Sequence, residues 1–570
     1  MDYNITVTGN AMKRDLHLTG VRNLLDVFID AGLEIPVLCN KNGSCGKCRV
    51  VVKAAANPVH EVERLSLGET LLGRGYRLAC KTEIMGEGEV FIPVESREDL
   101  IESACFGNEL DIIKSESSSW TDRFSALSSH SLISSSDEQF VAVDIGTTTL
   151  TGYLFDRGGN LLSHCSCFNP TTLFGADVIT RLTYIQSEDD GFLRVRQNLL
   201  KGVKRLINTL CFRAEGIDGK GDADNLFEKI AGMAVCGNTI MQCIFMGKNP
   251  VETGLYPYNP LIKELVRTKA GAASIASVSV DFSEIGLADN TELIIAPSVS
   301  GFIGGDAVCG TLAVRLHAPC EPWMLIDLGT NGEMVLSCRG RLYAASASAG
   351  PAFEGYMIGV GMRATIGAID SVTLDSGGEV SYTVIGGGRP KGICGSGVIS
   401  AIDALLCAGA LSSKGHILPL GDNGRIVRNS FTIAAKEDTG SADPISITDK
   451  DVEVIQQAKA SFAAGISCLL RSAGLRAQDL TKLYLAGAFG SRVDGGSLKR
   501  IGLIPPGVDA DIVPLGNAAG IGLAMLLLRE GVAEEAEQVA GTIETVGLAS
   551  LAEFEDEFVN ALFFKTDVHA

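Results

Sequence analysis

Four cysteines near the start of the chain have the types and spacing that bind a metal centre. Cys39, Cys45 and Cys48 lie in the segment CNKNGSCGKCRV and Cys80 lies in YRLACKTEI, so the spacing is C-x5-C-x2-C-x31-C. The glycines around Cys45 allow backbone amides to point inward at an anionic group. The chain has 16 cysteines, and the others are scattered through apolar stretches, where a free cysteine packs as a small hydrophobic residue.

This spacing favours a [2Fe–2S] cluster. One cysteine loop with one distant cysteine is the ligand arrangement of plant-type ferredoxins, whose first gap is four residues rather than the five found here. A zinc site usually has two CxxC pairs, or one pair with histidines. A thioredoxin-like CxxC would not need Cys39 or Cys80. We therefore predict that the cluster ligands are Cys39, Cys45, Cys48 and Cys80.

The residues around these cysteines predict a small α+β fold of the β-grasp ferredoxin type over residues 1–95. Residues 4–9 and 14–20 read as a hairpin, residues 23–33 as a short helix, and residues 47–55 and 88–94 as strands. Residues 96–138 are rich in serine and have little periodicity, so they predict a flexible linker.

Two later segments share a second pattern. FVAVDIGTTTLTGYLFD (140–156) and WMLIDLGTNGEMVLS (323–337) each run from an apolar strand to an aspartate, a Gly-Thr turn and a second strand. Successive amides in a glycine turn form an anion-binding nest, and threonine hydroxyls add donors. An aspartate at the strand end can hold Mg²⁺ through water. Two copies imply an internal duplication, with two phosphate-binding turns facing each other across a cleft.

A third element, KLYLAGAFGSRVD (482–494), is a buried strand ending in glycines, where the lack of side chains admits a base or ribose. A helix is predicted to begin near residue 516. The order of hairpin, hairpin, glycine strand and helix resembles the ATPase core shared by actin, sugar kinases such as hexokinase and the seventy-kilodalton chaperones. No Walker A motif is present, and the glycine-rich segments lack the strand–helix setting of a dinucleotide fold.

Together, the ferredoxin-like module, the linker and this core resemble the ATP-dependent reductive activators of corrinoid proteins. Further segments carry the resemblance: NPTTLFGADVITRL (169–182), AVCGNTIMQ (234–242), SGFIGGDAV (300–308), SAGPAFEG (348–355) and GICGSGVIS (392–400). The resemblance implies a cytoplasmic homodimer that uses ATP to donate one electron to a cobalt(II) corrinoid protein, giving cobalt(I). It also implies an upstream low-potential electron donor.

The resemblance assigns roles to the residues of the two hairpins and the glycine strand. Asp144 and Asp327 organise Mg²⁺ and its water, and Glu333, or Asp327 itself, orients the hydrolytic water. Gly487 and Gly490 line the adenosine. The phosphate-contacting residues are Gly146, Thr147, Thr148, Gly329, Thr330, Asn331 and Gly332.

The predicted architecture is therefore an α/β multidomain protein. A β-grasp domain precedes a duplicated actin/hexokinase-like (ribonuclease H-like) ATPase fold, with halves at residues 139–320 and 321–570. The net charge of −20 argues against nucleic acid and anionic membranes as partners, and no stretch is long and apolar enough for a membrane helix. Two other functions stay open: a small-molecule kinase with a redox-sensing ferredoxin domain, and a non-catalytic protein that senses nucleotide and redox state.

Overall fold

The computed structural model divides the chain into two compact units, one within residues 1–100 and 167–198 and the other within residues 101–166 and 199–570. Most of the predicted linker lies outside the described residues. The structure describes residues 2–9, 12–31, 33, 35, 41, 43, 46–93, 138–216, 224–270, 282, 284–316, 321–355, 357–375, 378–420, 424–427, 429–440, 444–487 and 493–565.

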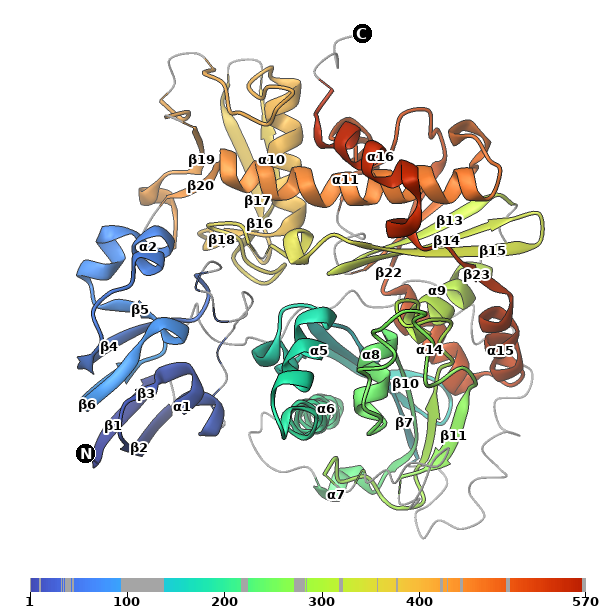
Figure 1. Cartoon of the computed structure of the whole chain (residues 1–570), viewed down its shortest axis with the longest axis horizontal. Coiled ribbons are helices and arrows are strands. Elements are labelled where there is room, and N and C mark those ends of the chain that lie inside the picture. The colour runs from blue at the N-terminus through green and yellow to red at the C-terminus, as the bar shows by residue number, and fades with distance from the viewer. Residues whose placement is uncertain are drawn as a thin grey trace. The chain divides into compact units, whose positions relative to one another are not determined.

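The first unit contains a sheet with the strand order β2-β1-β6-β4-β5, and β3 also pairs with β6 (Figure 1). β1 and β2 form an antiparallel hairpin, whereas β1 and β6 are parallel, as in a β-grasp fold. Its elements are β1 (Asp2–Gly9), β2 (Met12–Thr19), β3 (Arg22–Asn23), α1 (Leu24–Asp30), β4 (Arg49–Ala56), α2 (Glu61–Gly73), β5 (Tyr76–Leu78), η1 (Ala79–Lys81) and β6 (Glu83–Phe91). The predicted ferredoxin-like fold is confirmed.

A buried ion pair fixes β5 to α2 in this unit. Both Nε and Nη2 of Arg77 donate to the Glu63 carboxylate at 2.9 Å, and the backbone amides of Leu78 and His60 donate to the same carboxylate at 2.9 Å. Burial opposes ionisation of Glu63, but these hydrogen bonds outweigh it and lower the pKa of the carboxyl below its usual range. The clamp therefore positions the strand that leads directly into Cys80.

We expect Glu63→Gln to weaken the first unit strongly, because it leaves the Arg77 charge buried without its partner, at a cost of about 3–5 kcal/mol. Since the pKa of Glu63 is lowered by folding, its stabilisation is present above the ordinary value of 4.5 and is lost as the pH falls through the folded pKa. Amide hydrogen exchange of β4–β6, followed from pH 7 downward, measures both effects.

Glu69→Gln is the matched control, because Glu69 pairs with Arg64 on the surface, where the two side chains are 76% and 53% exposed. Such a pair contributes ~0–1 kcal/mol. Equal protection of the β4–β6 amides from hydrogen exchange in the two variants would contradict a stabilising role of the Glu63–Arg77 pair.

The second unit contains two six-stranded sheets that share the order of five strands and differ in the edge at which the sixth strand is added. In the first, the order is β11-β12-β10-β7-β8-β9, where β7 pairs antiparallel with β8 and parallel with β10. In the second, the order is β22-β21-β13-β14-β15-β23, where β13 pairs antiparallel with β14 and parallel with β21. The hairpins β7–β8 and β13–β14 therefore occupy equivalent places in the two sheets, as the repeated motif predicts.

Between residues 138 and 320 the described elements are β7 (Gln139–Ile145), β8 (Thr149–Asp156), β9 (Leu161–Phe168), η4 (Pro170–Phe174), α5 (Val178–Ser187), α6 (Gly191–Ala214), α7 (Asp224–Phe227), β10 (Ile230–Gly237), α8 (Thr239–Phe245), β11 (Val266–Lys269), β12 (Glu292–Ile295) and α9 (Gly305–Arg315). Of these, η4 and α5 belong to the first unit, β9 and α6 each include residues of both units, and the others belong to the second unit. α14 (Ala518–Leu528), which comes from the C-terminal part of the chain, packs against α9, β7 and β10. The predicted domain boundaries stay a prediction.

The remaining elements complete the second sheet, form one three-stranded and one two-stranded sheet, and supply further helices. They are β13 (Trp323–Leu328), β14 (Asn331–Cys338), β15 (Arg341–Ser348), η5 (Pro351–Glu354), β16 (Ala368–Leu374), β17 (Val380–Val384), β18 (Gly392–Ile393), α10 (Gly395–Cys407), β19 (Ser430–Ala434), η6 (Lys436–Asp438), β20 (Ile445–Thr448), α11 (Asp449–Ser472), η7 (Ala477–Asp479), β21 (Lys482–Ala486), α13 (Gly495–Arg500), β22 (Asp511–Gly516), α15 (Val532–Thr542), β23 (Ile543–Thr545), η8 (Leu548–Ser550) and α16 (Ala552–Leu562).

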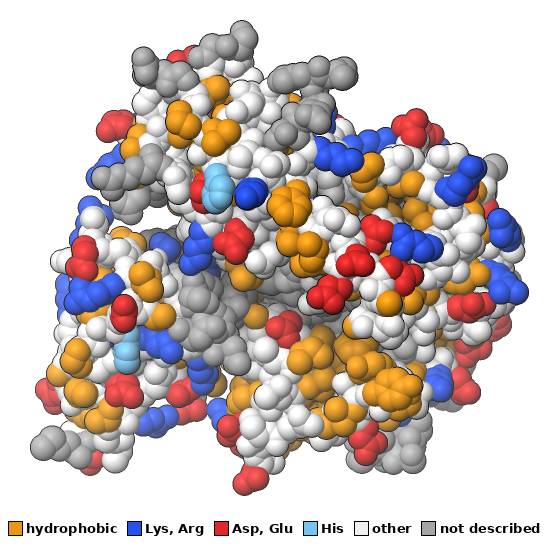
Figure 2. Space-filling view, turned by 45° about the horizontal axis from the view of Figure 1, so that its top comes forward, with side chains coloured by type: hydrophobic (Ala, Val, Ile, Leu, Met, Phe, Trp, Pro, Cys, Tyr) orange, Lys and Arg blue, Asp and Glu red, His pale blue; other side chains and the backbone are white. Residues whose placement is uncertain are grey.

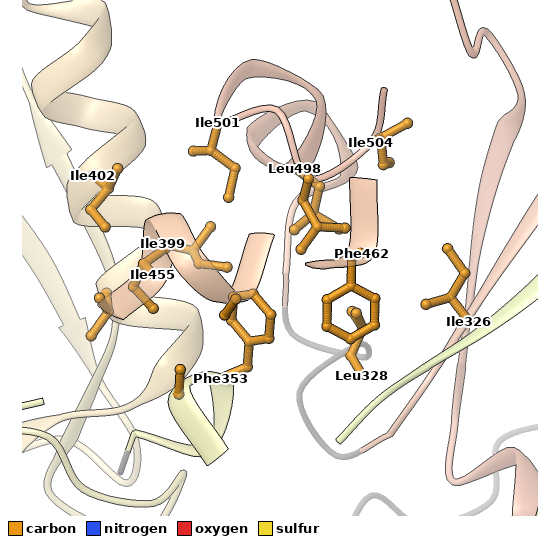
Figure 3. Close-up of a cluster of buried hydrophobic side chains, with 14 of the residues drawn as sticks. Ile326, Leu328, Phe353, Ile399, Ile402, Ile455, Phe462, Leu498, Ile501 and Ile504 are labelled. Carbon is orange, nitrogen blue, oxygen red and sulfur yellow. The ribbon is translucent and has the colours of Figure 1, made fainter. Parts of the chain in front are cut away.

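Strand β13 lies between two hydrophobic cores. Ile326 and Leu328 belong to a core shared with α10 and α11, whereas Trp323 and Leu325 belong to a core shared with α9 and α14. This is the alternation of a strand with both faces buried. Figure 3 shows Phe462 of α11 beside Leu328. The strand that carries the second predicted aspartate is therefore fixed from both sides.

The charged surface contributes less to this stability than the cores do. Figure 2 shows acidic and basic side chains interspersed over the face that it presents. Some form exposed pairs, such as Lys229 with Glu215 at 2.7 Å and Arg315 with Glu535 at 3.1 Å, each worth only ~0–1 kcal/mol. No helix within the described ranges is long and apolar enough to cross a membrane.

Candidate functional site

The two predicted phosphate turns lie at equivalent strand ends and line one cavity of the second unit. Each turn needs its glycines. A Cβ at Gly146 would lie 2.8 Å from the carbonyl oxygen of Thr149, and a Cβ at Gly332 would collide with the Phe462 ring. A side chain at either position would therefore displace its turn from the backbone or the core packed against it.

The two turns contact each other directly. The hydroxyl oxygens of Thr148 and Thr330 are 2.6 Å apart, and Thr330 also donates to Oε1 of Glu354 at 2.8 Å. Asn238 donates to the Thr147 hydroxyl at 2.9 Å. The sequence predicts turns that face each other across a cleft, whereas in the structure a hydrogen bond joins the two turns through hydroxyl groups expected to bind phosphate.

Five carboxyl groups line the cavity: Asp144, Asp306, Asp327, Glu333 and Glu354. Burial raises the pKa of Asp144 to about 6. Burial, together with the charge of Asp144, raises the pKa of Asp306 to about 7. Burial and the neighbouring acids likewise raise the pKa of Asp327 to about 7. The cavity therefore concentrates negative charge that a cation would stabilise.

Two asparagines connect these side chains to helix N-termini. Asn238 accepts the Met241 amide at 3.0 Å as the N-cap of α8, while its amide group reaches the first turn. Asn517 accepts the Gly520 amide at 2.8 Å as the N-cap of α14 and donates to Asp144 at 3.2 Å. A capping asparagine fixes its own side chain through the helix, so both donors are held in place.

The structure brings most of the predicted site residues together and adds others. The cavity is lined by the predicted residues Asp144, Gly146, Thr147, Thr148, Asp327, Gly329, Thr330, Asn331, Glu333 and Gly487. Gly332 pairs with Leu328 across the second hairpin, and Gly490 lies outside the described residues. The lining residues that the sequence analysis assigned no role include Asp306, Glu354, Arg363, Asn238 and Asn517. The roles of all these residues stay predictions.

Gly487 ends β21 at the cavity with φ of 91°, a conformation that glycine adopts without strain. A Cβ there would lie 2.8 Å from Oδ1 of Asp327 and 3.0 Å from the carbonyl oxygen of Leu328. The glycine therefore lets the third strand approach the acidic end of β13.

We expect Gly487→Ala to lower nucleotide affinity by about tenfold, because overpacking costs about 1–3 kcal/mol and here displaces Asp327. Titration calorimetry with ATP measures this. Gly474→Ala is the control, since Gly474 has φ of 67° but no atom within 4 Å of its Cβ position. It should lose about 1 kcal/mol of stability and keep its affinity. Equal ATP affinity in the two variants would contradict the assignment of Gly487 to the nucleotide site.

Two of the four predicted cluster ligands lie side by side in the first unit. The amide of Ala79 donates to the carbonyl of Cys48 at 2.8 Å, and Asn23 donates to the carbonyl of Cys80 at 3.2 Å. Both thiols are buried. Cys80 lies in the turn η1 directly after β5, rather than in a strand. Cys39 and Cys45 lie outside the described residues.

Neither site contains a complete protein-only cage for a metal ion. Within the described residues, no group of three or more His, Cys, Asp or Glu side chains has that geometry. For the cysteine site, two of the four candidates are outside the described part.

Comparison with known proteins identifies the family. The chain is 30% identical over 442 residues to the corrinoid activation enzyme RamQ of Eubacterium limosum, which covers 75% of this chain and 70% of that protein. The chain belongs to the family of reductive activators of corrinoid proteins. It is also 31% identical over 330 residues to the [Co(II) methylated amine-specific corrinoid protein] reductase of Methanosarcina barkeri, covering 54% of this chain and 56% of that protein.

Family models and a solved structure agree with this assignment. Residues 13–85 match the 2Fe-2S iron-sulfur cluster binding domain, residues 140–319 the RACo middle region, and residues 321–570 the C-terminal domain of RACo, the ASKHA domain. A solved structure of the reductive activator for corrinoid,iron-sulfur protein matches with a TM-score of 0.68 at 27% identity, covering 100% of this chain and 99% of that one. The family and the fold class predicted from the sequence are confirmed.

Proposed function

We propose that this protein reduces the cobalt(II) corrinoid of a partner protein to cobalt(I), using one electron from its iron–sulfur cluster and coupling the transfer to ATP. The observation that carries this proposal is the pairing, in one chain, of a [2Fe–2S] ferredoxin domain with facing phosphate turns in an ATPase core. Plant-type clusters have potentials near roughly −400 mV. ATP assists an uphill transfer only if nucleotide binds two conformations with different affinity.

The two turns are suited to hold the polyphosphate. The amides after Gly146 and Gly329 face the anion, and the hydroxyls of Thr148 and Thr330 exchange their mutual contact for phosphate oxygens. Mg²⁺, when bound, supplies a charge that neutralises the phosphates. The side chain of Asp144 is oriented for such an ion by the 3.2 Å hydrogen bond from Asn517.

Asp327 is the better placed of the two candidates for the hydrolytic base. Burial raises its pKa to about 7, and a base with a pKa near the working pH takes up a proton most effectively. Burial raises the pKa of Glu333 well above its usual range, which favours a neutral carboxyl that donates to water or phosphate. Glu333 lies directly opposite Asp327 in the second hairpin, so the two can contact one water.

The first unit fits a cluster that carries one electron. Buried cysteine thiolates are the ligands that such clusters take, and the adjoining backbone holds Cys48 and Cys80 together. Their neighbour Arg77 is neutralised by Glu63. An upstream low-potential donor that reloads the cluster, a homodimeric assembly and a cytoplasmic location stay predictions.

The test is to mix the purified protein with a cobalt(II) corrinoid protein, a reductant and MgATP, and to follow the cobalt(I) absorption. We expect Cys80→Ser to abolish reduction and keep ATP hydrolysis, because only the cluster loses a ligand. We expect Asp327→Asn to keep its iron and slow ATP hydrolysis and reduction by at least about a hundredfold.

Two variants are matched controls for this experiment. Cys407→Ser removes an exposed thiol outside both sites, and Asp509→Asn removes a fully exposed carboxylate; both should behave as the wild type. Equal reduction rates with and without nucleotide would contradict the proposal. Transfer of phosphate to an added small molecule would instead favour the kinase alternative.

A further inference from the structure

The charges around the nucleotide cavity are strongly unbalanced. Its described lining residues include five carboxyl groups and a single basic side chain, Arg363. A nucleoside triphosphate adds further negative charge, and even its magnesium complex stays anionic. A site of this kind needs a fixed cation near the phosphates, and an arginine keeps its charge at any working pH.

Arg363 reaches across the cavity from the second half of the core to the first phosphate turn. Its Nη2 lies 3.4 Å from the carbonyl oxygen of Thr148 and 3.5 Å from the hydroxyl oxygen of Thr149. A strong hydrogen bond from a guanidinium is about 2.7–2.9 Å long. These contacts are therefore weak, and phosphate oxygens at the same turn would replace them at little cost.

Arg363 also interacts with Glu354, the acid that is hydrogen-bonded to Thr330 of the second turn. The charge of Arg363 opposes the rise that burial causes in the pKa of Glu354. Glu354 in turn accepts the hydroxyl hydrogen of Thr330 at 2.8 Å, and Thr330 contacts Thr148. Arg363 thus contacts the first turn directly and interacts with the acid that is hydrogen-bonded to the second turn.

Backbone pairing fixes the segment that carries this arginine. Met362 donates its amide to the carbonyl of Ile393 at 2.8 Å, and Ile393 donates its amide to Val360 at 3.1 Å. β18, which contains Ile393, leads directly into α10, whose first residues also line the cavity. The side chain of Arg363 is therefore presented from a rigid edge of the site and not from a free loop.

We propose that Arg363 is a phosphate-binding residue of this site and supplies the fixed cation for a nucleoside triphosphate. The guanidinium leaves the Thr148 carbonyl and donates to phosphate oxygens. This inference deepens the proposed function, because it rests on nucleotide binding in the same cavity. It does not depend on the corrinoid partner.

The experiment compares MgATP and adenosine binding to the full chain by titration calorimetry. We expect Arg363→Gln to weaken MgATP binding by about tenfold to a hundredfold, as expected for loss of a charged hydrogen bond, and to leave adenosine affinity unchanged within about twofold. Arg363→Lys should recover part of the MgATP affinity, because it restores the charge without the planar fork. Added salt should weaken MgATP binding more in the wild type than in Arg363→Gln.

Arg341→Gln is the matched control, since Arg341 pairs with Glu544 at 3.6 Å on the surface, with its side chain 66% exposed. Unchanged MgATP affinity in Arg363→Gln would overturn the inference. Equal loss of MgATP and adenosine binding, with no recovery in Arg363→Lys, would also overturn it and assign Arg363 a structural role. Either result leaves reduction of the corrinoid protein by the wild type as a separate test, so the two proposals fail independently.

Discussion

The nucleotide site depends on the contact between the Thr148 and Thr330 hydroxyl groups, because it is the point where the two repeated hairpins meet. A single hydrogen bond between neutral groups contributes only about 0.5–1.5 kcal/mol. A ligand that binds both turns can therefore break it and replace it with stronger charge-assisted bonds. The strands behind the turns do not yield in the same way, since β13 is packed between two cores. The hairpins are therefore held firmly from behind, whereas the contact between them is weak.

Electrostatics determine which ligand this cleft accepts. Five acids line the cavity, and burial raises the pKa values of Asp144, Asp306 and Asp327. Without a cation, part of this charge is neutralised by protons near pH 7. A polyphosphate alone would be repelled, whereas a divalent ion and an arginine offset part of the negative charge of both the acids and the phosphates. In the proposed site, Arg363 and a divalent ion together would reduce the repulsion between these acids and an anionic substrate.

The sequence allows the hairpins to be predicted because their pattern is local. An apolar strand, Asp144 or Asp327 and a Gly-Thr turn all lie within a few residues, and each strand forms as expected. Glu354 and Arg363 could not be found in this way. Neither belongs to a periodic segment, and each reaches the site only through tertiary packing of η5 and β18. Glu354 does lie in SAGPAFEG, one of the segments that carry the family resemblance. The sequence therefore marks this segment as familial but does not assign a role to Glu354. Asn517 carries the weaker local signal of a helix cap.

The segment that carries Arg363 is also connected, through the Asp451 carboxylate, to α11, one of the two longest described helices. Asp451 accepts the amide and hydroxyl of Thr448 at 2.8 and 2.7 Å, which caps α11, and its other oxygen accepts the Gly359 amide at 2.7 Å. Gly359 belongs to the segment that carries Arg363. If that segment moved alone, the shared carboxylate would lose one set of bonds, and loss of a helix cap costs about 0.5–2 kcal/mol. If α11 moved with it, both sets of hydrogen bonds would be kept.

α11 has 24 residues and is therefore about 36 Å long, with α16 packed along it. The Asp451 carboxylate therefore links the position of the Arg363 segment to the N-terminus of α11, whose Phe462 packs against the second phosphate turn.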